Sequence, residues 1–217
     1  MEQTNIPTGS AQKKATIEAR GDPNIMGTVF DDIADYHPAL IKKIMELEHH
    51  PTLSNYLFRG GCGRKIYHIH QWGIPEAQLI HDRAITLFKQ VANSATAAVD
   101  ISWANIYRKG EYCMPHSHER SAASLVYCVQ TGDEDPDDPL AGRFVFVDPR
   151  ISSCCQKKEG YMTTPYLPEF TPGTMIIFPS QLVHSVNPYM GETPRITMSW
   201  NINKQTLPGQ ASDAWQK

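Results

Sequence analysis

The chain has 217 residues and a formal net charge of -3, from 20 Lys and Arg against 23 Asp and Glu. This length fits one domain of ordinary size. The charges nearly balance and no block of like charge stands out, so we expect neither nucleic acid nor a membrane surface as a partner.

The 5 cysteines and the N-terminal segment indicate the compartment. The cysteines are odd in number and lack the spacing of a zinc finger or a disulfide framework. The first residues carry no apolar signal-peptide core, and no stretch approaches the roughly 20 apolar residues of a membrane span. We therefore expect a cytoplasmic protein.

Taken in order, the chain begins with a polar segment, 1–24, that we expect to be a flexible tail or a late-added strand. The remainder, 25–217, is predicted to form one domain. Apolar residues at helical spacing predict helices within 31–50 and 74–93, each with a proline near its start. Between them, 59–73 alternates like a strand and carries His68 and His70, which we interpret as ordinary strand histidines.

From Val99 onward the helical period gives way to short apolar runs separated by Gly, Pro and Asp. A mainly β domain with flanking helices is therefore expected, as a sandwich or barrel whose one face the helices cover. The acidic insert at 131–142 is interpreted as a solvated loop. The strands are predicted at 99–108, 111–117, 121–130, 142–149, 160–166, 174–179, 183–189 and 195–202.

Three histidines form a candidate metal site. His116 and His118 stand two residues apart, so an extended backbone projects both to one side. His184 follows a distant apolar run and is the best candidate for the third ligand. Neutral imidazoles suit iron, zinc, copper or nickel, and a site that keeps open positions suits catalysis.

An arginine on a later apolar strand predicts an anion site. Arg195, Thr197 and Ser199 share one face of the run at 195–202 because side chains alternate with period two. A guanidinium matches a carboxylate bidentately, and the Thr197 hydroxyl could join it. The competing interpretation is an edge arginine paired with a carboxylate of the protein itself.

The order of these features resembles the Fe(II)/2-oxoglutarate-dependent oxygenases, closest to the 2OG-Fe(II) oxygenase group related to prolyl 4-hydroxylases. The resemblance spans roughly 100–203 and rests on YRKGEYCMPHSH, GRFVFVDPR, and PGTMIIFPSQLVHSVNPYMGETPR. It implies a double-stranded β-helix, or jelly roll, with Fe(II) and 2-oxoglutarate as cofactors. It also implies a dioxygenase that hydroxylates a small-molecule or peptidyl substrate and releases succinate and CO2.

The resemblance also implies roles for particular residues. His116 matches the first histidine of the family's metal motif and His184 the distal one, while Arg195 matches the arginine that holds the C5 carboxylate of 2-oxoglutarate. Thr197 occupies the hydroxyl position that follows this arginine. Tyr107 and Asn105 share a face of the preceding strand and would flank the cosubstrate.

One position departs from the family pattern, because His118 stands where the family has Asp or Glu. Three neutral ligands would leave the metal one charge more positive than the usual two histidines and one carboxylate. Glu119 is the adjacent carboxylate and the alternative third ligand. The sequence leaves the substrate and the oligomeric state open.

Two other functions remain open. Gly110, His116, His118 and His184 also resemble a cupin, so a three-histidine metalloenzyme that does not use 2-oxoglutarate is the alternative. That alternative gives no role to Arg195. The other is a binding or structural jelly roll whose metal site is vestigial.

Overall fold

The structure is a computed structural model that describes residues 25–118, 120–147 and 168–205. It also describes the backbone of three two-residue strands, β1 (Gln3–Thr4), β2 (Ala15–Thr16) and β3 (Glu18–Ala19). The rest of the predicted tail, 1–24, lies outside the described residues, and so does the strand predicted at 160–166.

The two predicted helices are confirmed. They are α1 (His37–Leu47) and α2 (Pro75–Val91), and both have a proline in the first turn, where its missing N–H is not needed. Two short 3-10 helices, η1 (Ile33–Asp35) and η2 (Ile69–Gln71), precede them. None of the helices in the described part of the chain is long and apolar enough to cross a membrane.

The strands from β7 onward lie where the sequence predicts them, and two earlier strands, β4 and β5, were not predicted. Each observed pairing is antiparallel. The strands are β4 (Met26–Val29), β5 (Ser54–Leu57), β6 (Gly61–Tyr67), β7 (Ala98–Tyr107), β8 (Tyr112–His116), β9 (Ala123–Gln130), β10 (Phe144–Phe146), β11 (Thr174–Pro179), β12 (His184–Val186) and β13 (Arg195–Asn203).

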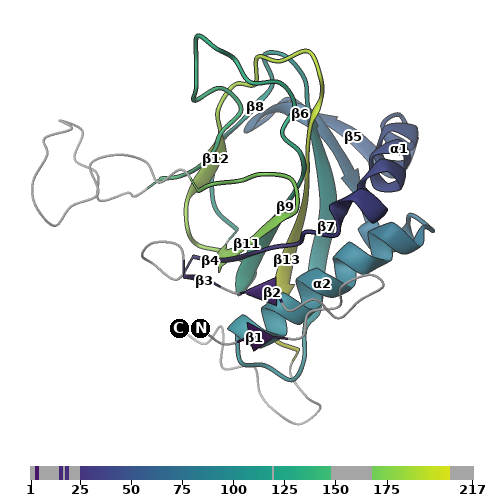
Figure 1. The fold of residues 1–217 in the computed structure, drawn as a ribbon, viewed down its shortest axis with the longest axis vertical. Coiled ribbons are helices and arrows are strands. Elements are labelled where there is room, and N and C mark those ends of the chain that lie inside the picture. The colour runs from purple at the N-terminus through teal and green to yellow at the C-terminus, as the bar shows by residue number, and fades with distance from the viewer. Residues whose placement is uncertain are drawn as a thin grey trace, which may run out of the picture.

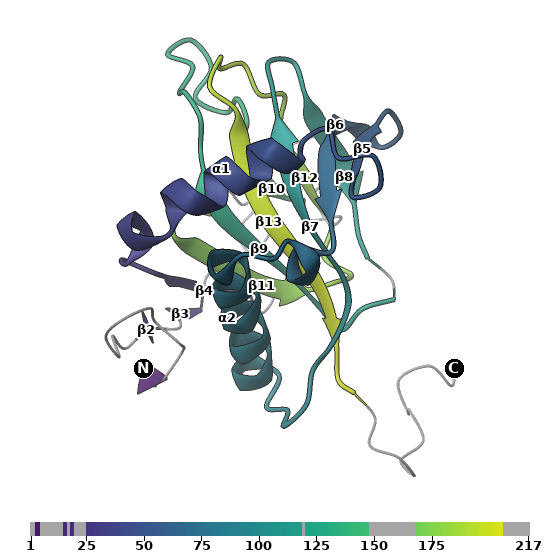
Figure 2. The same cartoon turned by 90° about the vertical axis from the view of Figure 1, so that its right-hand side faces the viewer.

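One large sheet in the order β10-β12-β8-β6-β7-β13-β9-β11-β4-β3 folds over on itself, with β5 paired to β6. In Figure 1, β8 and β12 lie on the side away from the helices, and Figure 2 shows α1 and α2 across the face of β7, β13 and β9. This is the jelly-roll fold that the sequence implied. A helix-side core packs under the helices, and a second apolar cluster fills the space between the two halves of the sheet.

The prediction of a strand through 59–73 is wrong at its end. Strand β6 stops at Tyr67, because His68 adopts a left-handed backbone (φ 59) and donates its N–H to the Ser102 carbonyl. The chain then enters η2, which carries His70. The His70 ring lies 5.8 Å from that of buried His81.

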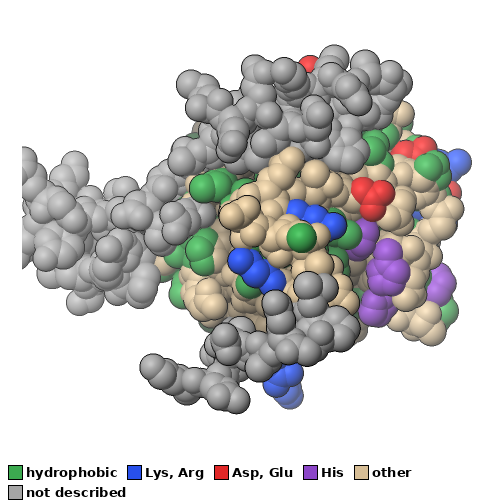
Figure 3. Space-filling view, turned by 90° about the horizontal axis from the view of Figure 1, so that it is seen from below, with side chains coloured by type: hydrophobic (Ala, Val, Ile, Leu, Met, Phe, Trp, Pro, Cys, Tyr) green, Lys and Arg blue, Asp and Glu red, His purple; other side chains and the backbone are tan. Residues whose placement is uncertain are grey.

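A group of histidine side chains is visible on one side of the molecule in Figure 3. Within the described residues, however, the only group of metal-binding side chains that could hold an ion is His116, His118 and His184. His68 and His70 do not belong to this group, and they are not strand residues as predicted.

Glycines let β6 pack closely against its neighbours β8 and β7. A Cβ on Gly61 (φ +126) would lie 2.4 Å from the Tyr112 carbonyl oxygen, and one on Gly63 (φ +152) would lie 3.0 Å from the Tyr107 ring. No side chain fits at the first position without moving backbone. The glycine-rich segment therefore brings β8, which carries His116, against the edge of β6.

Behind the sheet, a buried polar network joins the helices to β9. Arg83 pairs with Asp32 at 2.5 Å and donates to the Tyr36 hydroxyl at 2.8 Å, and the Tyr127 hydroxyl contacts that of Tyr36 at 2.9 Å and His37 Nε2 at 2.6 Å. Burial raises the pKa of Tyr36 to about 12 and lowers that of His37 to about 4, so both are neutral at pH 7.

Replacing Arg83 with Met is expected to lower the free energy of unfolding by about 3–5 kcal/mol, because it removes one partner of the largely buried Arg83–Asp32 ion pair. Urea denaturation measures the loss. Lys42→Met is the matched control, since Lys42 is exposed on α1 and its change should stay within about 0.5 kcal/mol. A loss below about 1 kcal/mol for Arg83→Met would show that the network contributes little.

Candidate metal and cosubstrate site

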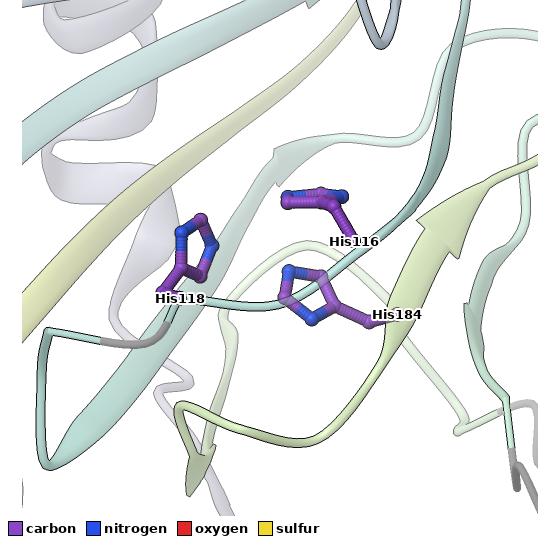
Figure 4. Close-up of side chains that lie close together, drawn as sticks. All are labelled: His116, His118 and His184. Carbon is purple, nitrogen blue, oxygen red and sulfur yellow. The ribbon is translucent and has the colours of Figure 1, made fainter.

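Strand pairing brings the three predicted histidines together. His184, at the start of β12, lies directly opposite His116, at the end of β8. His118 follows two residues later, and its N–H donates to the Ser180 carbonyl at 2.8 Å. Figure 4 shows the three rings facing a common space, and one ligand atom of each lies within 4.8 Å of the others.

Backbone carbonyls orient two of the rings. His116 Nδ1 donates to the Met114 carbonyl and His184 Nδ1 to the Leu182 carbonyl, each at 2.9 Å. The proton therefore sits on Nδ1 and the Nε2 lone pair is free, which is how metal-binding histidines are held.

The three rings are neutral at physiological pH. Burial lowers the pKa of His118 to about 4 and that of His184 to about 3, and the pKa of His116 is also lowered, first by burial. Metal binding requires the deprotonated imidazole. The triad is therefore ready to accept a metal without first losing protons.

Aromatic side chains enclose the histidines. The Phe178 ring lies 4.9 Å from that of His184, the Phe144 ring lies 5.6 Å from it, and the Trp103 ring meets the His118 ring at 5.9 Å. The sequence analysis did not select these aromatics. They surround the site with apolar surface that excludes water from its back.

Arg195 lies in the same cavity, at the first residue of β13 and opposite Tyr107 of β7. Its side chain is 4% exposed, and its Nη1 is fully buried without a hydrogen-bond partner among the described residues. The guanidinium carbon lies 5.6 Å over the Tyr107 ring. No ion pair with Arg195 is found in the described part of the chain, so the interpretation as an arginine paired with a protein carboxylate has no support there.

A row of polar side chains continues from Arg195 along β13. Asn105 Nδ2 donates to Thr197 Oγ1 at 3.2 Å and to Ser199 Oγ at 3.4 Å, while the Trp103 indole N–H donates to Asn105 Oδ1 at 3.0 Å. Because Thr197 Oγ1 already accepts a proton, its own hydroxyl hydrogen can be donated to an anion in the cavity. Asn105 therefore positions Thr197.

The residues present fit both expected cofactors. The cavity is lined by all three histidines together with Arg195, Thr197, Asn105 and Tyr107. The histidines offer free nitrogen ligands. The buried Arg195 Nη1, which has no partner among the described residues, predicts a bound anion, because a buried unpaired donor costs about 1–3 kcal/mol or more.

Of the two candidates for the third metal ligand, His118 and Glu119, Glu119 lies outside the described residues. The structure does bring His118 into the cluster with the other two histidines.

Residues 101–201 match the family model described as "Putative 2OG-Fe(II) oxygenase". The matched segment contains His116, His118, His184 and Arg195, so the similarity to these oxygenases covers the whole candidate site. No curated protein matches the chain.

Solved structures show the same fold at low sequence identity. The non-haem alpha-ketoglutarate-dependent epimerase SnoN from nogalamycin biosynthesis has 15% identity and a TM-score of 0.61, covering 89% of this chain and 88% of its own. SnoN in complex with Fe3+, alpha ketoglutarate and nogalamycin RO has 16% identity and a TM-score of 0.58, covering 89% of both chains. A Pseudomonas putida prolyl-4-hydroxylase has 14% identity and a TM-score of 0.57, covering 80% of this chain and 88% of its own.

The family model indicates that the chain is an Fe(II)- and 2-oxoglutarate-dependent oxygenase, and the solved structures show the fold. The resemblance implied by the sequence is thereby confirmed. The cupin-type alternative gains no support from either comparison.

Proposed function

We propose that this oxygenase is a dioxygenase in which His116, His118 and His184 hold Fe(II). The proposal is supported by the free Nε2 atoms of His116 and His184 and by the clustering of the three rings. It hydroxylates a small-molecule or peptidyl substrate and releases succinate and CO2.

Arg195 and Thr197 bind the C5 carboxylate of 2-oxoglutarate in this proposal. The observation that carries it is the buried Arg195 Nη1, unpartnered among the described residues, in the cavity that the histidines line. Thr197 donates its hydroxyl because Asn105 occupies its acceptor position. Tyr107 packs under the guanidinium and limits where the carboxylate can lie.

Fe(II) and 2-oxoglutarate, when bound, supply the oxidising chemistry, in which decarboxylation of the cosubstrate is coupled to oxygen use. The chain's own residues do the rest: Arg195 orients the cosubstrate, the backbone-bonded imidazoles hold the metal, and Phe144, Phe178 and Trp103 keep water from the back of the site.

We also propose that the protein works in a reducing compartment, the cytoplasm. Cys62, Cys113 and Cys128 are free thiols, which fits the cytoplasm.

The test is an anaerobic titration with Fe(II) followed by 2-oxoglutarate. A weak metal-to-ligand charge-transfer band should appear only after the second addition, and admitting oxygen should then release succinate. An iron-loaded sample that shows neither band nor succinate would contradict the proposed function. Succinate release against amino acids, peptidyl proline and small metabolites then searches for the substrate.

A further inference from the structure

Lys65 is a positively charged residue beside the histidine triad, and the sequence did not predict it. It lies on β6, directly opposite Asn105 of β7, and lines the same cavity as the histidines. Its ammonium lies over the ring of Trp103, and that ring meets the His118 ring at 5.9 Å. Lys65 therefore lies close to the proposed metal position.

The charge of Lys65 is not neutralised by any described residue. Its ammonium lies 4.7 Å over the Trp103 ring, and no carboxylate in the described part of the chain forms an ion pair with it. Burial lowers the pKa of Lys65, and the only opposing contribution comes from Cys113. A cation–π contact offsets only about 0.5–2 kcal/mol of such desolvation, so an anion is missing.

Lys65 also lines a second cavity, of about 190 Å³, that Arg195 does not reach. This cavity lies between β5, β6 and β8 and borders His116. Its charged lining residues are Arg59, Arg64 and Lys65, and no Asp or Glu is among the described residues that line it. The cavity is therefore suited to a small anionic molecule.

Arg195 and Lys65 both line the histidine cavity, but they enter it from different strands. Lys65 enters from β6 and Arg195 from β13, on opposite sides of β7, so their backbones are about 10 Å apart at ordinary strand spacing. Arg195 also lines a further cavity, bounded by 131–143, that Lys65 does not line. A cosubstrate carboxylate bound by Arg195 leaves Lys65 available for another ligand.

We propose that Lys65 binds an anionic group of the substrate, a carboxylate or a phosphate, in the cavity between β5, β6 and β8. The inference rests on the proposed function and narrows it to small organic acids or phosphate esters. A lysine is a compact point charge that accepts either group, and the cavity next to His116 would place the rest of the molecule near the metal. Lys65 is thus a specificity-determining residue.

Matched probes test this: hexanoate against hexanamide, and glycerol 3-phosphate against glycerol. Dissociation constants are measured by tryptophan fluorescence, because Trp103 lies under the Lys65 ammonium. The protein is metal-free and carries Arg195→Leu, so that the probes cannot use the guanidinium. At least one anion should bind about 10-fold or more tightly than its neutral counterpart.

Lys65→Met added to this background should abolish the preference, Lys65→Arg should keep most of it, and Lys42→Met, at an exposed position of α1, should change nothing. Equal binding of acid and neutral probe before Lys65 is changed would overturn the inference, and so would a preference that survives Lys65→Met.

A separate arm measures 2-oxoglutarate binding to Lys65→Met with Arg195 intact. An unchanged dissociation constant supports a substrate role, and a rise above about 10-fold overturns it by assigning Lys65 to the cosubstrate. The dissociation constants of the acid, amide, phosphate and alcohol probes are measured without iron, oxygen or catalytic turnover. A chain that shows the acid preference but releases no succinate would therefore fail the proposed function while leaving the anion site intact.

Discussion

Replacing Arg195 with Leu is expected to weaken 2-oxoglutarate binding by about 30-fold or more. Losing one partner of a buried charge pair costs about 2–5 kcal/mol, and each 1.4 kcal/mol is about tenfold in affinity. Calorimetric titration of the Fe(II)-loaded protein with 2-oxoglutarate measures the change. The effect is large because the guanidinium is buried and has no carboxylate partner among the described residues.

The same substitution should not destabilise the protein without cosubstrate. A buried cation whose Nη1 lacks a partner is desolvated without compensation, so Leu in its place should leave the melting temperature unchanged or raise it. Added 2-oxoglutarate should stabilise the wild type and not the variant.

Arg143→Leu is the matched control, since Arg143 is exposed and, among the described residues, its side chain hydrogen-bonds only to the Pro139 carbonyl. A 2-oxoglutarate dissociation constant for Arg195→Leu within threefold of the wild type would show that Arg195 does not bind the cosubstrate. It would favour the cupin-type alternative.

The second large effect concerns the metal. His116→Ala and His184→Ala should each lower Fe(II) affinity by more than about 100-fold, because losing even an outer hydrogen-bond partner of a ligand costs 10–100-fold. Metal analysis after iron loading and desalting measures the occupancy. The apolar enclosure by Phe144 and Phe178 gives no substitute ligand to His184→Ala.

His118→Ala and Glu119→Gln decide the third ligand. We expect the first to lose the metal and the second to keep it, since His118 lies in the cluster. The opposite result would assign the third position to Glu119. His118→Asp restores the family's carboxylate and should bind Fe(II) at least as tightly as the wild type, because it adds a negative charge to the ligand set.

Local patterns predicted much of the fold and part of the site. The apolar spacing of 74–93 predicts α2 because a helix repeats every 3.6 residues, and Arg195, Thr197 and Ser199 share a face because a strand repeats every two. Such periods arise from backbone geometry alone. They do not tell a strand end from its continuation, which is why His68 and His70 were placed on a strand.

The sequence by itself therefore determined the helices, the later strands, the pair His116 and His118, and the face that carries Arg195. Only the tertiary structure decided that His184 lies opposite His116, that Arg195 meets no carboxylate in the described chain, and that Lys65 joins the site. These relations depend on which strands pair across long stretches of chain, and pairing is set by packing of the whole sheet.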